Sequence, residues 1–327
     1  MHPSTVRGVH FYGNRLFCLS LVYILEIYYK KNCAGTVGSG KVIALSDKIK
    51  IIADSTCDLS PEIQKKYDIE VHPFVVNLGE DSFQDGVNIT TSDILKYYKS
   101  TGKLSKTAAA PPSEYEELFR SWGEKGYEIL FFTISKDFSS AVENARIGAE
   151  GLDYVHIIES ANLSTGILLE VLTAADMIAE GRSAADIAAA IEHDVVPKVR
   201  TSFVIDTLEF LWKGGRCSGV AALGANLLRL KPCIEVVDGK MRVGKKYRGS
   251  IDKVVPQYIA DRLAMTPHVV RRRVFITHTF EDRKPVEAAL KQVRKTGLFD
   301  EVLETRAGCT VYSHCGPNTL GILYIEE

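Results

Sequence analysis

The stretch "IKIIADSTCDLSPEIQKKY", residues 49–67, contains a strand pattern followed directly by a helix pattern. Its first six residues form a short apolar run that ends in Asp54, which is typical of a buried parallel strand. Ser60 can cap the helix, and Pro61 suits the first turn, where a backbone N–H has no intrahelical partner. The stretch therefore predicts the first strand–helix unit of an α/β domain.

The same alternation continues to about residue 199. Short apolar runs are followed by longer segments with capping residues, and some of these end in glycine. Strands are expected at 69–78, 128–135 and 154–160, and helices at 90–100, 113–126, 139–151, 165–181 and 183–199. Strand–helix alternation of this kind indicates a doubly wound α/β domain with a mostly parallel sheet. We assign it residues 48–199.

The pattern changes after Arg200. Asp238-Gly239 lies between two apolar runs and predicts a hairpin turn. Helices are expected at 222–230, 251–264 and 283–296, and further strands at 272–278, 299–305 and 319–326. A hairpin combined with helices indicates a second, smaller α+β domain at 200–327.

Residues 1–47 show no pattern that pairs with the rest of the chain. The apolar run at 16–25 is too short to span a bilayer. It is open to three interpretations: a signal segment, an extra packing element, or a stretch upstream of the natural start. We favour the last of these, which makes 1–47 an extension outside the domains.

Residues 35–41 fit most of a phosphate-binding loop, G-x-x-x-x-G-K. However, Val42 stands where Ser or Thr would hold Mg²⁺, and the loop precedes a strand instead of following one. We interpret the segment as a Gly/Ser linker, and the sequence predicts no ATP site and no cofactor.

The composition of the chain argues against one class of function and indicates a location. The chain has 327 residues, of which 46% are hydrophobic, and a formal net charge of −1. This balance argues against a dedicated nucleic-acid-binding protein, which would be strongly basic. Seven cysteines without a C-x-x-C pair predict reduced thiols and a cytoplasmic location, and they lack the spacing of a zinc site. No metal is expected.

Small hydroxyl residues follow several predicted strands. They stand at 54–56, at 135–140, at 159–160 and in the stretch that ends at Thr107. Loops at the carboxyl ends of parallel strands converge on one crevice, so these hydroxyls can form a hydrogen-bonding cradle. His314 precedes the constrained Gly316-Pro317 turn and is a further candidate.

Two arginines are candidate anion-binding groups. Arg216 follows two glycines, and Arg248 precedes one, so each is a cation on a predicted loop. The sequence contains neither a G-x-S-x-G elbow nor an H-E-x-x-H motif. We therefore expect no catalytic residues, and a binding protein instead of an enzyme.

The order of motifs from residue 48 onward resembles the DegV family, fatty-acid-binding proteins of bacteria. The motifs are "DSTCDLS" (54–60), "FQDGVNIT" (83–90), "KTAAAPPSEY" (106–115), "ISKDFSSAVENA" (134–145), "LEFLWKGGRCS" (208–218), "LLRLKPCIEVVDGKM" (227–241), "YRGSIDK" (247–253) and "HCGPNTLGILY" (314–324). In that family a fatty acid lies in a tunnel between two domains. A separate ATP-dependent kinase phosphorylates its carboxyl group, and the acyl phosphate feeds phospholipid synthesis.

The resemblance assigns roles to five residues. It implies that Thr107, Ser139 and His314 contact the fatty-acid carboxylate, and that Arg216 and Arg248 lie near the mouth or dock the kinase. The implied partners are a long-chain fatty acid, the kinase, an acyltransferase and, transiently, a membrane surface. The main alternative is a sugar-binding subunit of a dihydroxyacetone-kinase-like phosphotransfer system, in which a histidine holds a small ketose. A second alternative is an interaction module without a ligand.

This sequence departs from the family pattern at two motifs. The family's T-S-Q-P-S becomes T-A-A-A-P at 107–111, and its S-G-T-Y-Q-S becomes S-S-A-V-E-N at 139–144. Glu143 is then expected one helical turn from Ser139, where its charge would disfavour a bound carboxylate if it faced the site.

Overall fold

The computed structural model describes residues 48–217, 219, 230–265 and 268–327. The predictions for residues 1–47, including the glycine loop, and for nearly all of the helix at 222–230 lie outside these residues. The described part of the chain belongs to one compact unit, which extends from Ser46 to Glu327. None of its helices is long and apolar enough to cross a membrane.

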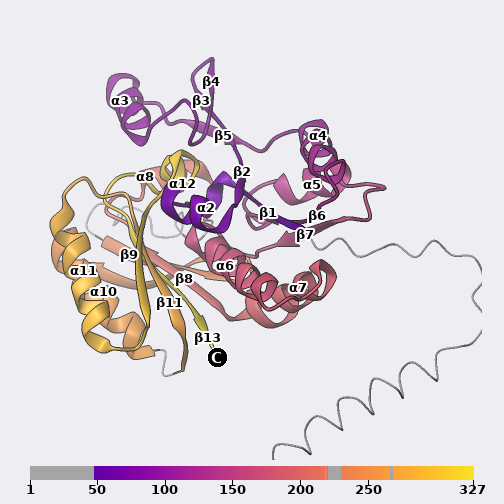
Figure 1. Cartoon of the computed structure of the whole chain (residues 1–327). Helices are drawn as coiled ribbons and strands as arrows, with labels where there is room; N and C mark the ends of the chain where they lie inside the picture. The colour runs from indigo at the N-terminus through magenta and orange to yellow at the C-terminus, as the bar shows by residue number, and fades with distance from the viewer. Residues whose placement is uncertain (1–47, 218, 220–229, 266–267) are drawn as a thin grey trace, which may run out of the picture. The chain divides into compact units, whose positions relative to one another are not determined.

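The first sheet has four parallel strands in the order β2-β1-β6-β7, as the alternation predicted (Figure 1). The strands are β1 (Ile49–Asp54), β2 (Glu70–His72), β6 (Glu128–Thr133) and β7 (Val155–Glu159). The single strand predicted at 69–78 is wrong. It is divided into β2 and β3 (Val75–Leu78), which belong to different sheets, and Pro73 lies between them, where it cannot donate to a ladder.

Helices cover both faces of the parallel sheet. Side chains alternate along a strand, and in β6 Ile129 and Phe131 pack in one cluster while Leu130 and Phe132 pack in another. The first cluster includes α4 (Pro112–Gly123) and α5 (Ala141–Gly148), and the second includes α6 (Thr165–Ala179) and α7 (Ala184–Ala190). This arrangement confirms the doubly wound domain.

Capping hydrogen bonds explain where two further helices begin. Ser60 accepts a hydrogen bond from the Ile63 amide at the start of α2 (Pro61–Tyr67), as predicted. Thr90 and Asp93 form a reciprocal capping box at the start of α3 (Thr91–Thr101). After α7, one π turn (Ile191–Val195) and one 3₁₀ turn (Val196–Lys198) lead into the second sheet.

The second sheet is mixed, with the order β10-β9-β8-β13-β11-β12. Its pairs are antiparallel except β11–β12. The strands are β8 (Val199–Val204), β9 (Leu230–Val237), β10 (Lys240–Arg248), β11 (Val269–His278), β12 (Glu301–Arg306) and β13 (Leu320–Glu326). Asp238 and Gly239 have φ of 51° and 75° between β9 and β10, which confirms the predicted tight hairpin turn.

Helix α6 packs against both large sheets, and its buried side chains join residues of β1, β6, β8 and β13 in one hydrophobic core (Figure 1). The other face of the mixed sheet is covered by α10 (Ile251–Met265) and α11 (Arg283–Thr296). The parallel and mixed sheets thus correspond to the two predicted domains, whose boundaries at 48–199 and 200–327 stay a prediction.

A small third sheet and two short helices were not predicted. The sheet has the order β4-β3-β5, with β4 at Asp81–Gln84 and β5 at Lys106–Ala108. The helices are α8 (Glu209–Gly214) and α12 (Cys309–Cys315). Residues of α3, β3 and α12 share one apolar cluster, so this part of the fold places β5 beside the last helix.

Candidate functional site

Thr107 and His314 meet although they are 207 residues apart in sequence. The Thr107 hydroxyl lies 2.8 Å from Nε2 of the His314 imidazole. Thr107 is positioned by pairing of β5 with Val76 of β3, and a hydrogen bond of 2.7 Å from Ser105 to Ser313 ties β5 to α12. Two of the three predicted head-group residues are therefore in direct contact.

Two buried aspartates fix the start of α12. Asp85 accepts hydrogen bonds from the amides of Cys309 and Thr310, at 2.8 and 3.0 Å, and from the Ser55 hydroxyl at 3.0 Å. Asp58 accepts one from the Gly308 amide at 2.8 Å. Burial raises the pKa of Asp58 to about 8, with smaller contributions from Asp85 and Asp54.

A cavity of about 50 Å³ adjoins this contact and is lined by all three predicted head-group residues, Thr107, Ser139 and His314. Most of the other lining side chains are apolar: Phe74, Ile134, Phe138, Leu163, Met241, Val311 and Cys315. The lining comes from both predicted domains. We call this space the head-group cavity.

The His314 imidazole is uncharged near neutral pH. Burial, and secondarily the charge of Arg216, lower its pKa to about 4. Its Nδ1 has no hydrogen-bond partner among the described residues. A neutral imidazole still offers one N–H donor, and the tautomer determines which nitrogen carries it.

Ser139 lies in the loop between β6 and α5. Its hydroxyl oxygen accepts a hydrogen bond from the Ala141 amide at 3.2 Å, which leaves its own O–H available as a donor. The loop is held by the Ser135 hydroxyl, which donates to the Gly239 carbonyl at 2.8 Å. Glu143 is exposed and does not line the cavity, so the expected repulsion has no structural basis.

The two arginines occupy different places. Arg216 lines the head-group cavity and donates to the carbonyls of Gly214, at 2.6 Å, and Phe138, at 3.5 Å. Arg248 is exposed at the end of β10, while the cavity-lining Met241 lies near the start of that strand, roughly 20 Å away at the usual rise per residue. The role of Arg248 stays a prediction.

Thr310 is a candidate that the sequence reasoning missed. Residues four apart lie on one face of a helix, so Thr310 and His314 of α12 both line the head-group cavity. The Thr310 hydroxyl is buried and has no hydrogen-bond partner in the described part of the chain. The T-x-x-x-H spacing would have indicated it if a helix had been predicted at 309–315.

The head-group cavity adjoins a wide groove of about 730 Å³. Thr107, Arg216 and His314 line both spaces. Among the described residues, the groove is also lined by the cations Lys103, Lys106 and Lys213 and by no carboxylate. An anionic group bound at Thr107 and His314 would therefore face a positively charged opening, which we call the basic groove.

A second cavity, of about 30 Å³, adjoins the first. The two share the lining residues Leu163, Val311 and Cys315. Its walls include Phe203 of β8 and Leu323 of β13, so it extends along the mixed sheet. We call this space the distal cavity.

No group of three or more His, Cys, Asp or Glu side chains suited to a metal ion occurs in the described residues.

The two large sheets, and a cavity lined by residues of both predicted domains, define a class of two-sheet α/β binding protein. The chain belongs to the DegV family, since the model of that family, described as "Uncharacterised protein, DegV family", matches residues 48–327. The resemblance in the motifs is thereby confirmed. A DegV domain-containing protein of Clostridium perfringens is 31% identical over 286 residues, which cover 86% of this chain and 99% of that relative.

Two solved structures are also similar. A fatty-acid-binding DegV family protein of Thermus thermophilus has a TM-score of 0.79 and 27% identity, and the match covers 86% of this chain and 100% of that one. The fatty acid kinase B3 protein of Streptococcus pneumoniae, loaded with linoleic acid, has a TM-score of 0.73, with the same coverage. At 20% identity this second likeness shows the fold alone.

Proposed function

We propose that this protein binds a long-chain fatty acid and presents its carboxyl group to a separate ATP-dependent kinase. The observation that carries the proposal is that Thr107, Ser139 and His314 all line one largely apolar cavity. Fatty acid binding by the Thermus thermophilus relative supports it. The apolar lining disfavours the sugar-binding alternative, since a small ketose would find few polar partners there.

The acyl chain supplies most of the binding free energy. Each buried methylene contributes about 0.8 kcal/mol, so a chain of about sixteen carbons gains on the order of 12 kcal/mol before ordering costs. A hydrogen bond to the charged head group adds about 1.5–3 kcal/mol. The hydroxyls and the imidazole therefore act mainly to orient the carboxylate.

The chain path runs from the head-group cavity into the distal cavity. Volumes of about 50 and 30 Å³ hold only a few water molecules, at roughly 10–15 Å³ for one. A long acyl chain needs more room, so side chains along the path must move apart when it binds. Entry of the ligand is thus expected to require a conformational step.

The basic groove supplies access for the kinase. It reaches the same Thr107 and His314 that would hold the carboxylate, and its lysines and Arg216 would attract the charges of a nucleotide or of an acidic kinase surface. The described residues need only hold and orient the carboxyl group, while the phosphoryl transfer takes place on the kinase. The acyl phosphate would then pass to an acyltransferase at the membrane.

The test compares palmitic acid with its methyl ester in titrations of wild type and two variants. Ser139→Ala removes a donor from the head-group cavity, and we expect roughly ten- to a hundredfold weaker binding of the acid. Ser140→Ala is the matched control, since Ser140 is exposed and does not line the head-group cavity. Unchanged preference for the acid over the ester in Ser139→Ala would contradict the assignment.

Mass spectrometry of a denatured extract provides a second readout. A co-purified long-chain fatty acid supports the proposal. A covalently trapped sugar would instead favour the rejected alternative.

A further inference from the structure

The hydroxyl of Thr201 is buried in the wall of the distal cavity without a partner. Thr201 stands in β8 with 3% of its surface exposed, and its Oγ1 makes no hydrogen bond to any described residue. Gly166 lies close by, and a Cβ added there would come within 2.7 Å of that oxygen. A buried hydroxyl without a partner is rare in native proteins and calls for a ligand or a water as its explanation.

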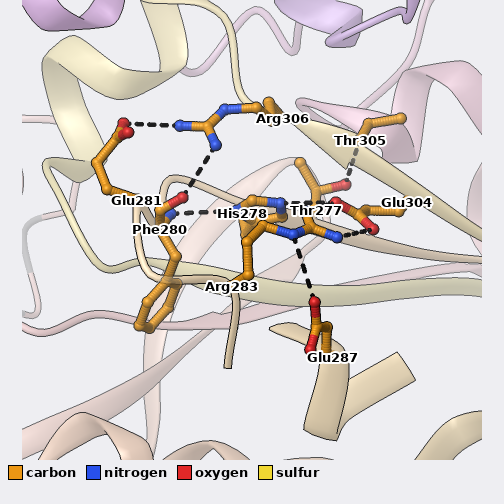
Figure 2. Close-up of polar contacts among 9 residues, drawn as sticks. All are labelled: Thr277, His278, Phe280, Glu281, Arg283, Glu287, Glu304, Thr305 and Arg306. Atoms are coloured by element: carbon orange, nitrogen blue, oxygen red, sulfur yellow. Dashed lines mark hydrogen bonds and ion pairs between the residues drawn. The ribbon is translucent and has the colours of Figure 1, made fainter. Parts of the chain in front are cut away.

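The other polar groups of this wall are already engaged. The His278 Nδ1 accepts a hydrogen bond from the Phe280 amide at 3.1 Å, and its Nε2 lies 3.1 Å from Glu304 (Figure 2). Thr277 bonds to Thr305 in the same network. The Ser164 hydroxyl donates to Asp58, and the Ser202 hydroxyl bonds to Tyr258. The hydroxyls of Thr279 and Thr319 donate to the carbonyls of Gly316 and Cys315, respectively. Within this wall, Thr201 is the hydroxyl left for a ligand.

The start of α6 adds a second reason to expect an electronegative atom here. Ser164, the N-cap of this fifteen-residue helix, lines the distal cavity. The N-terminal end of a helix carries partial positive charge, which favours an oxygen over a methylene group. A plain alkyl chain would leave the Thr201 hydroxyl unpaired, whereas an oxygen on the chain would pair with it.

We propose that the distal cavity binds an oxygen carried by the acyl chain, so that the preferred ligand is a hydroxylated long-chain fatty acid. The inference rests on the proposed function, because it requires the chain to run from the head-group cavity into the distal one. The shared residues Leu163, Val311 and Cys315 provide that continuity. Thr201 is then the residue that selects for the chain hydroxyl.

The experiment measures the affinity of the full chain for stearic acid and for monohydroxystearic acids with the hydroxyl at successive carbons. In wild type, at least one positional isomer should bind about tenfold more tightly than stearic acid. Thr201→Val keeps the shape of the side chain and should abolish that preference, while Thr201→Ser should retain it. Thr173→Val, on α6 but outside the distal cavity, is the control and should behave as wild type.

Two results would overturn the inference while leaving fatty acid binding intact. The first is that no hydroxystearic acid isomer binds wild type more tightly than stearic acid does. This comparison uses wild type alone, and the result would mean that Thr201 faces only water. The other is that a preference exists and persists in Thr201→Val. Failure of stearic acid itself, and of every isomer, to bind wild type would overturn the proposed function along with this inference.

Discussion

Gly214, the last residue of α8, lies against the imidazole of His314: a Cβ at Gly214 would be 2.6 Å from Nδ1. The three nearest heavy atoms outside α8 that such a Cβ meets all belong to this ring. The glycine therefore allows the backbone of α8 to pack on one side of the imidazole while Nε2 on the other side contacts Thr107 at 2.8 Å. A side chain at position 214 would therefore collide with the imidazole in its observed orientation.

Gly214→Ala should weaken fatty acid binding about tenfold, because the added methyl displaces the imidazole from Thr107 and costs one hydrogen bond. Calorimetric titration with palmitic acid measures the loss. Gly214→Ala combined with His314→Ala is the control, and it should bind no more weakly than His314→Ala alone. A further loss of affinity in the double variant would mean that Gly214 affects fatty acid binding independently of His314.

Titration of His314 should lower the free energy of unfolding as the pH falls from about 6.5 to 4, whereas the raised pKa of Asp58 acts in the opposite direction over this window. The pKa of His314 is about 4 in the folded protein against 6.5 ordinarily, so at this residue the unfolded chain binds more protons in this window and is favoured there. At pH 4.5 the contribution of His314 is on the order of 2–3 kcal/mol. Urea denaturation at pH 7 and 4.5 should show that the change in the free energy of unfolding is more unfavourable for wild type than for His314→Gln, since Asp58 titrates in both proteins. Parallel changes in the two proteins would contradict the lowered pKa of His314.

Gly239→Ala should destabilise the protein more than Gly297→Ala, by about 1 kcal/mol. Both glycines have positive φ, 75° and 64°, so both substitutions strain the backbone. Only at Gly239 does the new Cβ meet another group, 2.9 Å from the Ser135 hydroxyl that fixes the Ser139 loop. Thermal unfolding of the two variants measures the difference, and equal midpoints would show that the hairpin contact is dispensable.

Arg216→Ala should slow phosphoryl transfer by a bacterial fatty acid kinase more than it weakens fatty acid binding. Arg216 lines the basic groove and is held by two backbone carbonyls, so it is in place to meet the kinase or its nucleotide. Arg248→Ala is the comparison, since Arg248 lines neither the groove nor the head-group cavity. Equal transfer rates for wild type and Arg216→Ala would exclude this role.

The parallel sheet was predictable because its signals are local. Strands such as β1 and β6 are short, mostly apolar runs, and caps such as Ser60 mark the starts of helices. The hairpin at Asp238-Gly239 was predictable for the same reason, since its turn requires residues that tolerate positive φ.

The parts that were missed depend on distant residues. Helix α12 is too short for a periodic signal, and its start is fixed by Asp85, more than two hundred residues earlier in the chain. Strands β4 and β5 are three or four residues long and largely exposed, so their apolar pattern is weak. Thr310 went unnoticed as a consequence, although the family resemblance gave the neighbouring His314.

The pairing of Thr107 with His314 also has a consequence for biosynthesis. A nascent chain exposes Thr107 and the Ser139 loop long before the ribosome has made His314, and loop closure over 207 residues is entropically costly and slow. The parallel sheet can form during translation, but the carboxylate cradle is completed only after α12 has emerged and docked. Under the proposed function, only chains whose synthesis has passed that helix have the complete Thr107–His314 site for a fatty-acid carboxylate.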